Sequence, residues 1–342
     1  MALYSSTLDC ISLSHCALAT MEKPHYGRTG LLASRLSGLP VAQPRLVTSS
    51  SGVVSPSRTL KWYPSLLTVP QQLLDALRRE DDGEEDGLES AGHKFSADPT
   101  LVTYLRVATI AESLIQRWHR GRSTQSGAPS LKVSSSRAQV AGLYASILKW
   151  ARGKVNASTH ASSSAPLKQG TFFVPAYKLL VMKDEKRVVE YANITRRSVW
   201  LLGKEPVVND VPLEHPSCSG QHAALEMRFV LVDEAPLSQF IEAQTKGAST
   251  PHAALPCYTP DSNELRALCE GMWQVLADQQ EAAGEDATGV WTVELQLVDL
   301  GSTNFTKLNG AVVPAMEPTT VIESDVLEFG CSTRKYVVLR SA

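Results

Sequence analysis

The stretch His215-Pro216-Ser217-Cys218-Ser219-Gly220-Gln221-His222 leads into an apolar run at 223–231, and together they indicate the fold class of the chain. A second stretch, Asp299-Leu300-Gly301-Ser302-Thr303-Asn304, follows the apolar run at 291–299. Both stretches carry the small hydroxyl, amide and glycine residues that favour turns. We therefore expect two tight turns at the ends of β-strands, where polar groups form a shallow site for one phosphate group.

Short runs rich in β-branched and aromatic residues continue on both sides of these turns, and Asp, Gly, Asn and Pro separate them. The runs lie at 171–174, 177–182, 187–191, 198–202, 223–231, 291–299, 320–322 and 336–339. Many short strands with turns between them are typical of a sandwich or a barrel. We expect an all-β sandwich in the C-terminal half.

One long interruption separates two of these runs, at about 234–290. It begins as a loop rich in Pro, Ala and Thr, and Asp261-Ser262-Asn263-Glu264 then resembles a capping box at the start of a helix. Apolar residues follow with helical spacing, at Leu265, Leu268, Met272, Trp273 and Leu276. We expect a loop plus one amphipathic helix, whose apolar face packs on its own domain or binds a partner helix.

Helical patterns also precede the strand region. The clearest begins with Asp98 as the cap and Pro99 in the first position, and it continues to about residue 120. Its apolar positions are Leu101, Leu105, Ala108, Ala111, Ile115 and Trp118. Weaker patterns lie at 62–80 and 137–151. These segments predict a small helical region.

The first 60 or so residues are rich in Ser, Leu and Ala and contain few acidic residues. The tail is therefore expected to be disordered, or to act as an organellar transit peptide, or to precede a true start at Met21. The expected domains are a disordered or targeting tail at 1–60, a helical region at 61–156, a linker at 157–170 and the sandwich at 171–342. With its inserted helix and the N-terminal helices, the fold is mixed overall.

The composition excludes several classes of protein. The net charge of -2 gives no general attraction to nucleic acid, and no apolar run reaches the roughly 20 residues that span a bilayer. The six cysteines are scattered without a C-x-x-C pair, which favours a reducing compartment and argues against a zinc site or a disulfide framework. Common nucleotide, zinc-protease and hydrolase motifs are absent. We expect no enzyme activity, no cofactor, no metal site, no membrane contact and no direct nucleic-acid contact.

Several motifs follow one another in a fixed order. Gly203-Lys204 ends one run, the turn from Ser219 to His222 comes next, and the Ser302-Thr303-Asn304 turn precedes Leu308-Asn309-Gly310. Asp325-Val326-Leu327-Glu328-Phe329-Gly330 then predicts a late strand. In order and spacing these motifs resemble a forkhead-associated domain over about 173 to 341, apart from the inserted helix. The resemblance implies a β-sandwich that binds phosphothreonine.

Longer strings are similar to one branch of this family, the Smad-nuclear-interacting and plant Dawdle type. They are SVWLLGK at 198–204, DVPLEHPSCSGQHA at 210–223 and DVLEFGCSTRKYVVL at 325–339. This type includes the forkhead-associated subunit of the retention-and-splicing complex. The resemblance therefore implies a nuclear role in pre-mRNA processing.

The resemblance also implies which residues bind a phosphopeptide. Lys204 stands where arginine is usual, and Ser219 matches the phosphate-binding serine. Thr303 and Asn304 match the family's Thr-Asn pair, whose asparagine holds the peptide backbone. The residues expected to shape the turns are Gly203, His222 and Gly310.

Two positions depart from the family pattern. Gly220 stands where arginine or lysine is usual, so a direct phosphate cation is missing, and Phe305 stands where glycine is usual. The leading hypothesis is a non-enzymatic module that binds phosphothreonine-containing partners in a nuclear splicing assembly, spliceosomal or RNA-processing proteins among them. The alternative is a scaffold with weakened or lost phosphate binding in another chromosomal or organellar complex. The nucleus is the expected location, with the mitochondrion as the alternative.

Overall fold

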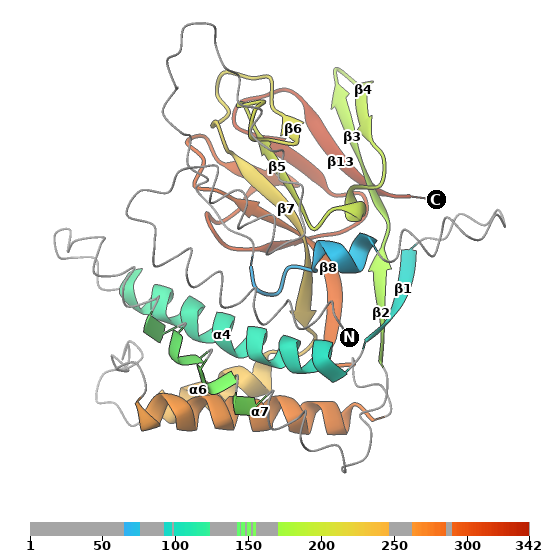
Figure 1. Ribbon diagram of the computed structural model, residues 1–342. Coiled ribbons are helices and arrows are strands. Elements are labelled where there is room, and N and C mark those ends of the chain that lie inside the picture. The colour runs from blue at the N-terminus through green and yellow to red at the C-terminus, as the bar shows by residue number, and fades with distance from the viewer. Residues whose placement is uncertain are drawn as a thin grey trace, which may run out of the picture. The chain divides into compact units, whose positions relative to one another are not determined.

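The computed structural model describes residues 65–75, 92–97, 99–123, 170–245, 262–284 and 289–341, together with short helical pieces between 142 and 154 (Figure 1). The tail expected at 1–60 lies outside the described residues. So does the linker expected at 157–170, apart from residue 170.

The chain divides into two compact units that alternate along the sequence. The helical unit contains Ser96–Thr171 and Leu231–Thr292. The sandwich unit contains Phe172–Val230 and Val293–Ala342, together with the segment at 65–75. The linear domain ranges expected from the sequence stay a prediction.

Two β-sheets, mostly antiparallel, form the sandwich. One sheet has the strand order β10-β9-β12-β13-β3-β4, and the other has the order β11-β8-β7-β5-β6. The strands of the first sheet are β3 (Tyr177–Lys183), β4 (Lys186–Tyr191), β9 (Thr306–Leu308), β10 (Ala311–Val312), β12 (Val326–Phe329) and β13 (Lys335–Arg340). Those of the second are β5 (Val199–Gly203), β6 (Val211–Pro212), β7 (Ala223–Leu231), β8 (Trp291–Asp299) and β11 (Thr319–Val321). A further pair, β1 (Gly92–Ala97) and β2 (Gly170–Pro175), forms a small sheet of its own.

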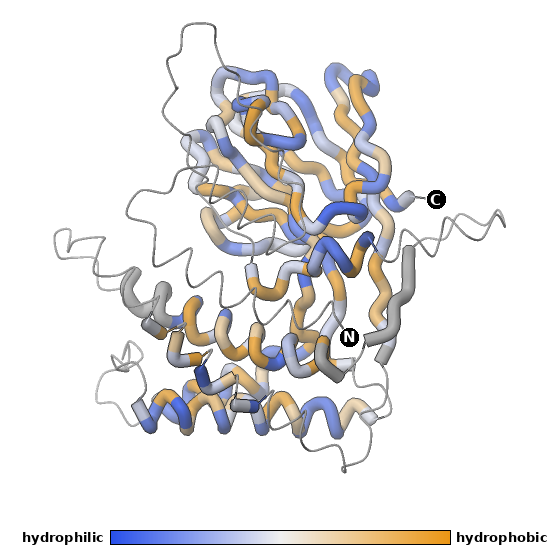
Figure 2. Tube along the Cα trace, in the orientation of Figure 1, coloured by the Kyte–Doolittle hydropathy of each residue, from blue (hydrophilic) through white to orange (hydrophobic). Residues whose placement is uncertain are grey.

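The core of the sandwich follows from alternation along the strands. In β3 the side chains of Tyr177, Leu179 and Val181 are buried, and in β13 those of Tyr336 and Val338 are buried. Side chains two positions apart in a strand point to the same face. Burying apolar side chains of this size stabilises the fold by about 1.5–3 kcal/mol each. Figure 2 shows apolar and polar residues mixed along the strands in this way.

The predicted sandwich is confirmed, and the predicted strand runs agree with the observed strands apart from small shifts at their ends. The motif Leu308-Asn309-Gly310 forms a hairpin, since Ala311 pairs with Leu308. Asn309 and Gly310 have φ values of 52° and 83°. Positive φ at both central residues fits a type I′ turn, which matches the twist of the flanking strands.

The segment at 65–75 pairs with the second sheet. The N–H of Val69 donates to the carbonyl of Met227 (2.8 Å), and the N–H of Phe229 donates to the carbonyl of Leu67 (2.8 Å). A short helix at 71–75 follows Pro70, inside the predicted helical pattern at 62–80. The sequence grouped this segment with the helical region, whereas it forms hydrogen bonds with β7 and with Arg196 and Ser198 just before β5.

The helical unit contains α4 (Pro99–Ser123), α6 (Ala235–Thr245) and α7 (Asn263–Ala282). Among the predicted inward positions of α4, Leu101, Leu105, Ala108 and Ala111 are buried, and Ile115 is half-buried. The side chain of Trp118 lies outside the described residues. No helix among the described residues combines the length and apolar character needed to span a bilayer.

The prediction of a single helix in the insertion was wrong, because α6 forms where a loop was expected. Leu237 and Ile241 of α6 are buried. A Cβ at Gly271 of α7 would lie 2.1 Å from the ring of Phe240, so α6 and α7 approach closely at that point. The segment is rich in Pro and Ala, as loops are. Its close packing against α7 nevertheless favours a helix there.

The predicted amphipathic helix is α7, and Ser262 caps it by accepting the N–H of Leu265 (3.1 Å). Leu265, Leu268, Met272 and Leu276 are buried, and Trp273 is half-buried. Figure 2 shows the alternation of apolar and polar residues along this helix.

The ring of Trp273 meets the ring of Trp150 edge to face, at a centroid distance of 5.9 Å. Arg106 of α4 lies 5.0 Å from the Trp273 ring, in a cation–π contact. The apolar face of α7 therefore packs within the helical unit of the same chain.

Candidate functional site

The candidate residues lie on neighbouring loops because of the strand order. β5 and β8 both lie next to β7. β5 ends at Gly203, β7 begins at Ala223 and β8 ends at Asp299. β5 pairs with β7 in antiparallel register, and hydrogen-bonded antiparallel neighbours place the end of one strand beside the start of the next. The loops after β5, before β7 and after β8 therefore meet at one edge of the sheet.

Gly203 is the point of closest approach between the first two loops. The N–H of Lys204 donates to the carbonyl of Ser219 (2.9 Å), and the N–H of Glu205 donates to the carbonyl of Gly220 (3.1 Å). A Cβ at Gly203 would lie 2.3 Å from the Gly220 carbonyl oxygen. Only a residue without a side chain fits there, because the two loops approach so closely.

Ser219 and Thr303 join the second and third loops. The N–H of Thr303 donates to the hydroxyl oxygen of Ser219 (3.1 Å). The side-chain amide of Asn304 donates to the carbonyl of Ser217 (2.8 Å). The structure therefore brings Ser219, Thr303 and Asn304 together, and the exposed Lys204 joins them through its backbone.

His222 links the same two loops through hydrogen bonds of its buried ring. Its ring is fully buried. Nδ1 accepts the N–H of Ser219 (3.0 Å), and Nε2 lies 3.2 Å from the carbonyl oxygen of Phe305. Since Nδ1 accepts, the ring proton belongs on Nε2, where it donates to Phe305. Burial lowers the pKa of His222 despite the opposing effects of that carbonyl and of Asp299. A neutral histidine thus serves as a structural link between the turns.

Asp299 organises the third loop, and the sequence did not single it out. Its carboxylate accepts the N–H of Ser302 (2.8 Å) and the hydroxyls of Ser302 (2.6 Å) and Thr306 (2.6 Å). Burial would raise the pKa of Asp299, but these hydrogen bonds outweigh it and hold the pKa below its ordinary value. An aspartate three residues before a serine is a turn signal that could have found it.

Gly310 lies apart from this group. It belongs to the hairpin between β9 and β10, so β9 separates it from Asn304. Its φ of 83° and the open space around it fit a permissive turn position. Gly310 therefore shapes the hairpin, and none of the described contacts joins it to Ser219 or Asn304.

Ser217 and Cys218 lie beneath the turn. The Ser217 hydroxyl lies 2.7 Å from Nδ1 of His215 and accepts the N–H of Cys331 (2.8 Å). Cys218 is buried, and burial is the main cause that raises the pKa of its thiol. A protonated, buried thiol packs and does not act as a nucleophile.

The loop at 204–210 is tied to the sheet by Asn209 and Asp210. The Asn209 amide donates to the carbonyls of Glu205 (2.7 Å) and Gly220 (2.6 Å). Asp210 accepts the N–H of Leu201 (3.0 Å) and pairs with Arg197 (2.5 Å). Burial raises the pKa of Asp210 even though Arg197 and the N–H of Leu201 oppose it.

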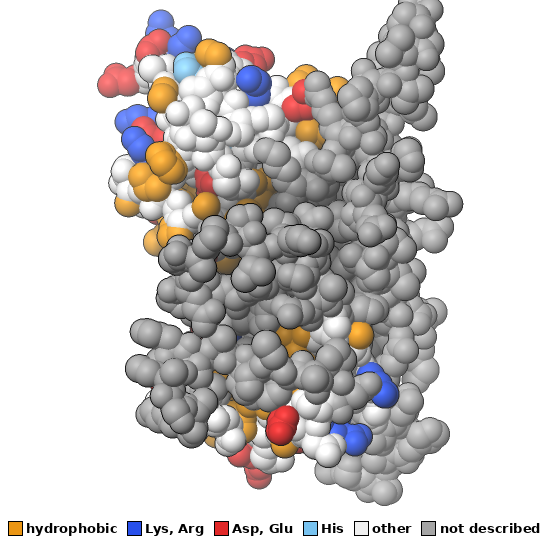
Figure 3. All heavy atoms as spheres, turned by 90° about the vertical axis from the view of Figure 1, so that its left-hand side faces the viewer, with side chains coloured by type: hydrophobic (Ala, Val, Ile, Leu, Met, Phe, Trp, Pro, Cys, Tyr) orange, Lys and Arg blue, Asp and Glu red, His pale blue; other side chains and the backbone are white. Residues whose placement is uncertain are grey.

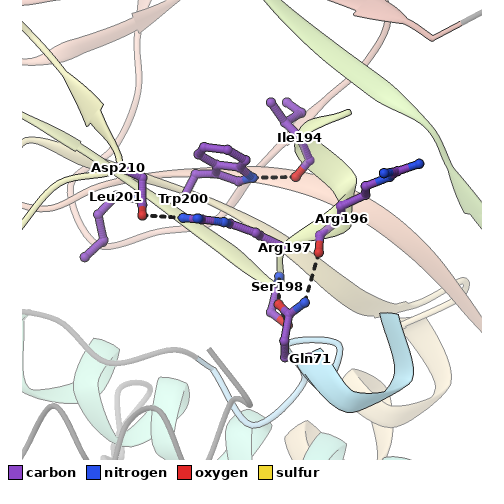
Figure 4. A network of polar contacts seen from close by, with 8 residues as sticks. All are labelled: Gln71, Ile194, Arg196, Arg197, Ser198, Trp200, Leu201 and Asp210. Carbon is purple, nitrogen blue, oxygen red and sulfur yellow. Dashed lines mark hydrogen bonds and ion pairs between the residues drawn. The ribbon is translucent and has the colours of Figure 1, made fainter. Parts of the chain in front are cut away.

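Figure 4 shows that this loop connects to the N-terminal segment. Arg197 lies over the ring of Trp200, 4.7 Å from its centroid. The next residue, Ser198, donates its N–H to the side chain of Gln71 (2.9 Å), and Gln71 donates to the carbonyl of Arg196 (2.9 Å). A polar network therefore runs from Gln71 to the loop that carries Lys204.

The charges around the site are mixed. Lys204 is an exposed cation, whereas the exposed Gly220 carries no charge. Arg334 forms an ion pair with Glu214 (2.8 Å). Figure 3 shows basic and acidic side chains interspersed with apolar ones on the described part of one face. The described residues include no cluster of His, Cys, Asp or Glu arranged to hold a metal ion.

No protein-family model matches the chain. Two curated relatives match about half of it. The chain is 25% identical to the FHA domain-containing protein DDL of Arabidopsis thaliana over 163 residues, which are 48% of this chain and 36% of DDL. It is 26% identical to Smad nuclear-interacting protein 1 of Mus musculus over 166 residues, 48% of this chain and 30% of the relative. The match thus spans about a third of these relatives.

Solved structures are similar over the same share of the chain. Full-length yeast Pml1p is 16% identical with a TM-score of 0.28, covering 48% of this chain and 81% of Pml1p. The MEK1 FHA domain is 14% identical with a TM-score of 0.29, covering 48% of this chain and 90% of that domain.

The strand order and the loops agree with the motifs that the sequence presented. Ser219, Thr303 and Asn304 meet on loops whose spacing is that of the family pattern. The curated relatives match over about half of the chain. The chain is similar to forkhead-associated domain proteins of the type that includes DDL and Smad nuclear-interacting protein 1.

Proposed function

We propose that this protein is a non-enzymatic interaction module that binds partner proteins through a phosphorylated threonine. A phosphothreonine carries a charge of about -1.5 to -2 and three acceptor oxygens. It needs convergent donors and at least one cation. In this proposal the Ser219 hydroxyl and the Thr303 hydroxyl donate to the phosphate, and Lys204 supplies the positive charge.

The contacts leave the required groups available. The Ser219 oxygen accepts from Thr303, so its hydroxyl hydrogen can point outward to a ligand. The Asn304 amide nitrogen is used on Ser217, which leaves its Oδ1 to accept a peptide N–H. Lys204 is exposed, and its ammonium has no ion pair with a described residue. The site thus offers hydroxyl donors for the phosphate, an amide oxygen that can accept from the peptide backbone, and the ammonium group of Lys204.

The hydrogen bond from the Thr303 N–H to Ser219 carries the proposal, because it joins the two loops at the point where a phosphate would lie. The test is a phosphothreonine peptide array probed with the full chain. Ser219→Ala and Asn304→Ala should each weaken binding by about tenfold or more, as expected for hydrogen bonds to a charged group. Thr320→Ala, an exposed hydroxyl on β11, is the matched control. Equal binding to the unphosphorylated array would refute the proposal.

A scaffold that no longer reads phosphate is the second candidate, and Gly220 favours it. This exposed position lacks the cation of the family pattern, so the charge opposite a phosphate is reduced. Treatment of a cell extract with phosphatase separates the two candidates. Partner capture that survives phosphatase supports the scaffold, whereas lost capture supports phosphothreonine binding.

The proposed setting is a nuclear assembly that processes pre-mRNA. The support is the resemblance of the strings at 198–204, 210–223 and 325–339 to the Smad-nuclear-interacting and Dawdle type. Imaging of the tagged full chain tests the compartment, with a mitochondrial signal favouring the alternative. Mass spectrometry of purified complexes tests the setting, with spliceosomal proteins as the expected partners.

A further inference from the structure

We propose that Phe305 determines the sequence specificity of this site by contacting an apolar side chain of the peptide next to the phosphothreonine. The inference rests on the proposed function. It adds the class of peptide that the site selects, an apolar residue one or two positions from the phosphothreonine.

Phe305 has two properties that do not stabilise the fold. Its side chain is 57% exposed, and its backbone has a φ of 60°. A bulky residue with positive φ is a genuine outlier, because the side chain crowds the following carbonyl. Glycine would relieve the backbone and remove the exposed ring. Residues held against such strain cluster where function requires them.

The backbone around Phe305 is fixed from several directions. Its carbonyl accepts the N–H of Gly330 (3.0 Å) and faces Nε2 of the buried His222 (3.2 Å). The neighbouring Asn304 is bound to Ser217, and Thr306 is bound to Asp299. A rigid backbone presents the ring in one place. An aromatic anchor of this kind binds with little loss of conformational entropy.

The position of Phe305 sets what it can reach. It directly follows Thr303 and Asn304, which are proposed to hold the phosphate and the peptide backbone. An extended peptide advances about 3.3 Å per residue. The ring therefore lies within reach of a side chain one or two positions from the phosphothreonine.

Charge and affinity favour an apolar side chain there. Lys204 already places a positive charge on these loops, which disfavours a second cation from the peptide. Gly220 provides no charge, so the site draws less of its affinity from the phosphate. Burial of apolar surface on the ring supplies affinity that the reduced charge does not.

The experiment compares wild type, Phe305→Gly, Phe305→Leu and Ser324→Gly as full chains. Ser324 is the matched control, because it is exposed with a φ of 72° and lies on another loop. Fluorescence polarisation measures binding of phosphothreonine peptides that carry Leu, Gly, Lys or Asp at the two positions on each side. Calorimetry measures the unfolding temperature of each variant.

Wild type is expected to prefer the Leu peptides over the Gly peptides by about tenfold. Phe305→Gly should lose this preference, while its unfolding temperature rises by about 2–4 °C as the strain is relieved. Phe305→Leu should keep part of the preference. Ser324→Gly should raise the unfolding temperature and leave the preference unchanged.

Two results would overturn the inference, and they differ in what else they refute. If Phe305→Gly still binds phosphopeptides and keeps the preference of wild type, the role of Phe305 is refuted and the proposed function stands. If wild type binds none of the phosphorylated peptides better than its unphosphorylated form, the proposed function fails and the inference fails with it.

Discussion

Gly203 lies where β5 passes closest to the loop before β7, and its neighbours leave no room for a side chain. Gly203→Ala is expected to lower the free energy of unfolding by about 1–3 kcal/mol, because the new Cβ would overlap the Gly220 carbonyl. Urea denaturation measures this. Gly220→Ala is the control, since its Cβ would lie 3.9 Å from the nearest atom, Cβ of Glu205. Equal stability of the two variants would contradict the account of Gly203.

Gly220 leaves space for the cation that the site lacks. Gly220→Arg is expected to raise the affinity for phosphothreonine peptides by about threefold to tenfold, because a guanidinium forms charge-assisted hydrogen bonds with phosphate. The gain should shrink as the salt concentration rises. Titration calorimetry at two salt concentrations checks this, with Gly220→Gln as the uncharged control. An arginine variant no tighter than the glutamine variant would show that no phosphate lies near this position.

His222 should titrate below its ordinary pKa of 6.5, because burial disfavours the charged ring. The unfolded chain then takes up the proton first as the pH falls. Stability from this residue is therefore complete above about pH 6.5, decreases below it and levels off below the lowered pKa. An NMR titration of the ring carbons measures the pKa directly. A value at or above 6.5 would contradict the buried, neutral form.

The sequence could predict Ser219, Thr303 and Asn304 because they stand on turns whose residue types and order carry the signal. It could not predict the partners of these residues. The bond from Thr303 to Ser219 joins positions 84 residues apart. Asn209 donates to the carbonyl of Gly220 across the loops that the pairing of β5 with β7 brings together. Such contacts are fixed by tertiary packing, for which local residue types give no signal.

Among the secondary-structure elements, the segment at 65–75 stabilises residues that lie far from it in the sequence. Gln71 is buried, and its side chain accepts the N–H of Ser198 and donates to the carbonyl of Arg196. Gln71→Ala should lower the free energy of unfolding by about 2 kcal/mol, because it leaves the buried N–H of Ser198 without a partner. Chemical denaturation of the full chain checks this. Gln72→Ala is the control, and a loss as large in that variant would contradict a specific role for Gln71.

The strands were easier to predict than the helices. β7 and β8 are long, apolar and bounded by turn residues, so the residues themselves indicate strands without knowledge of their tertiary contacts. α6 has only 11 residues, and its helical form depends on contact with α7. A short helix is marginal without tertiary packing. Local propensity therefore could not identify α6, whereas the capping box before α7 did identify that helix.

For the chain as a whole, segments that are far apart in the sequence belong to the same compact unit. Thr68 donates to the buried Glu226, which lies 158 residues further along the chain. The segment around Thr68 therefore belongs with the sandwich, although its helical pattern suggested otherwise. The helices before and after β7 likewise form one unit. No local pattern encodes these groupings, since they depend on which apolar faces cover one another.

The central claim is that the loops carrying Lys204, Ser219, Thr303 and Asn304 read a phosphothreonine. The most direct measurement is titration calorimetry of the full chain with a degenerate phosphothreonine peptide library and with the same library unphosphorylated. We expect saturable binding of the phosphorylated library, at least tenfold weaker binding in Ser219→Ala, and no binding of the unphosphorylated one. Equal heats of binding from both libraries, or full affinity in Ser219→Ala, would contradict the claim.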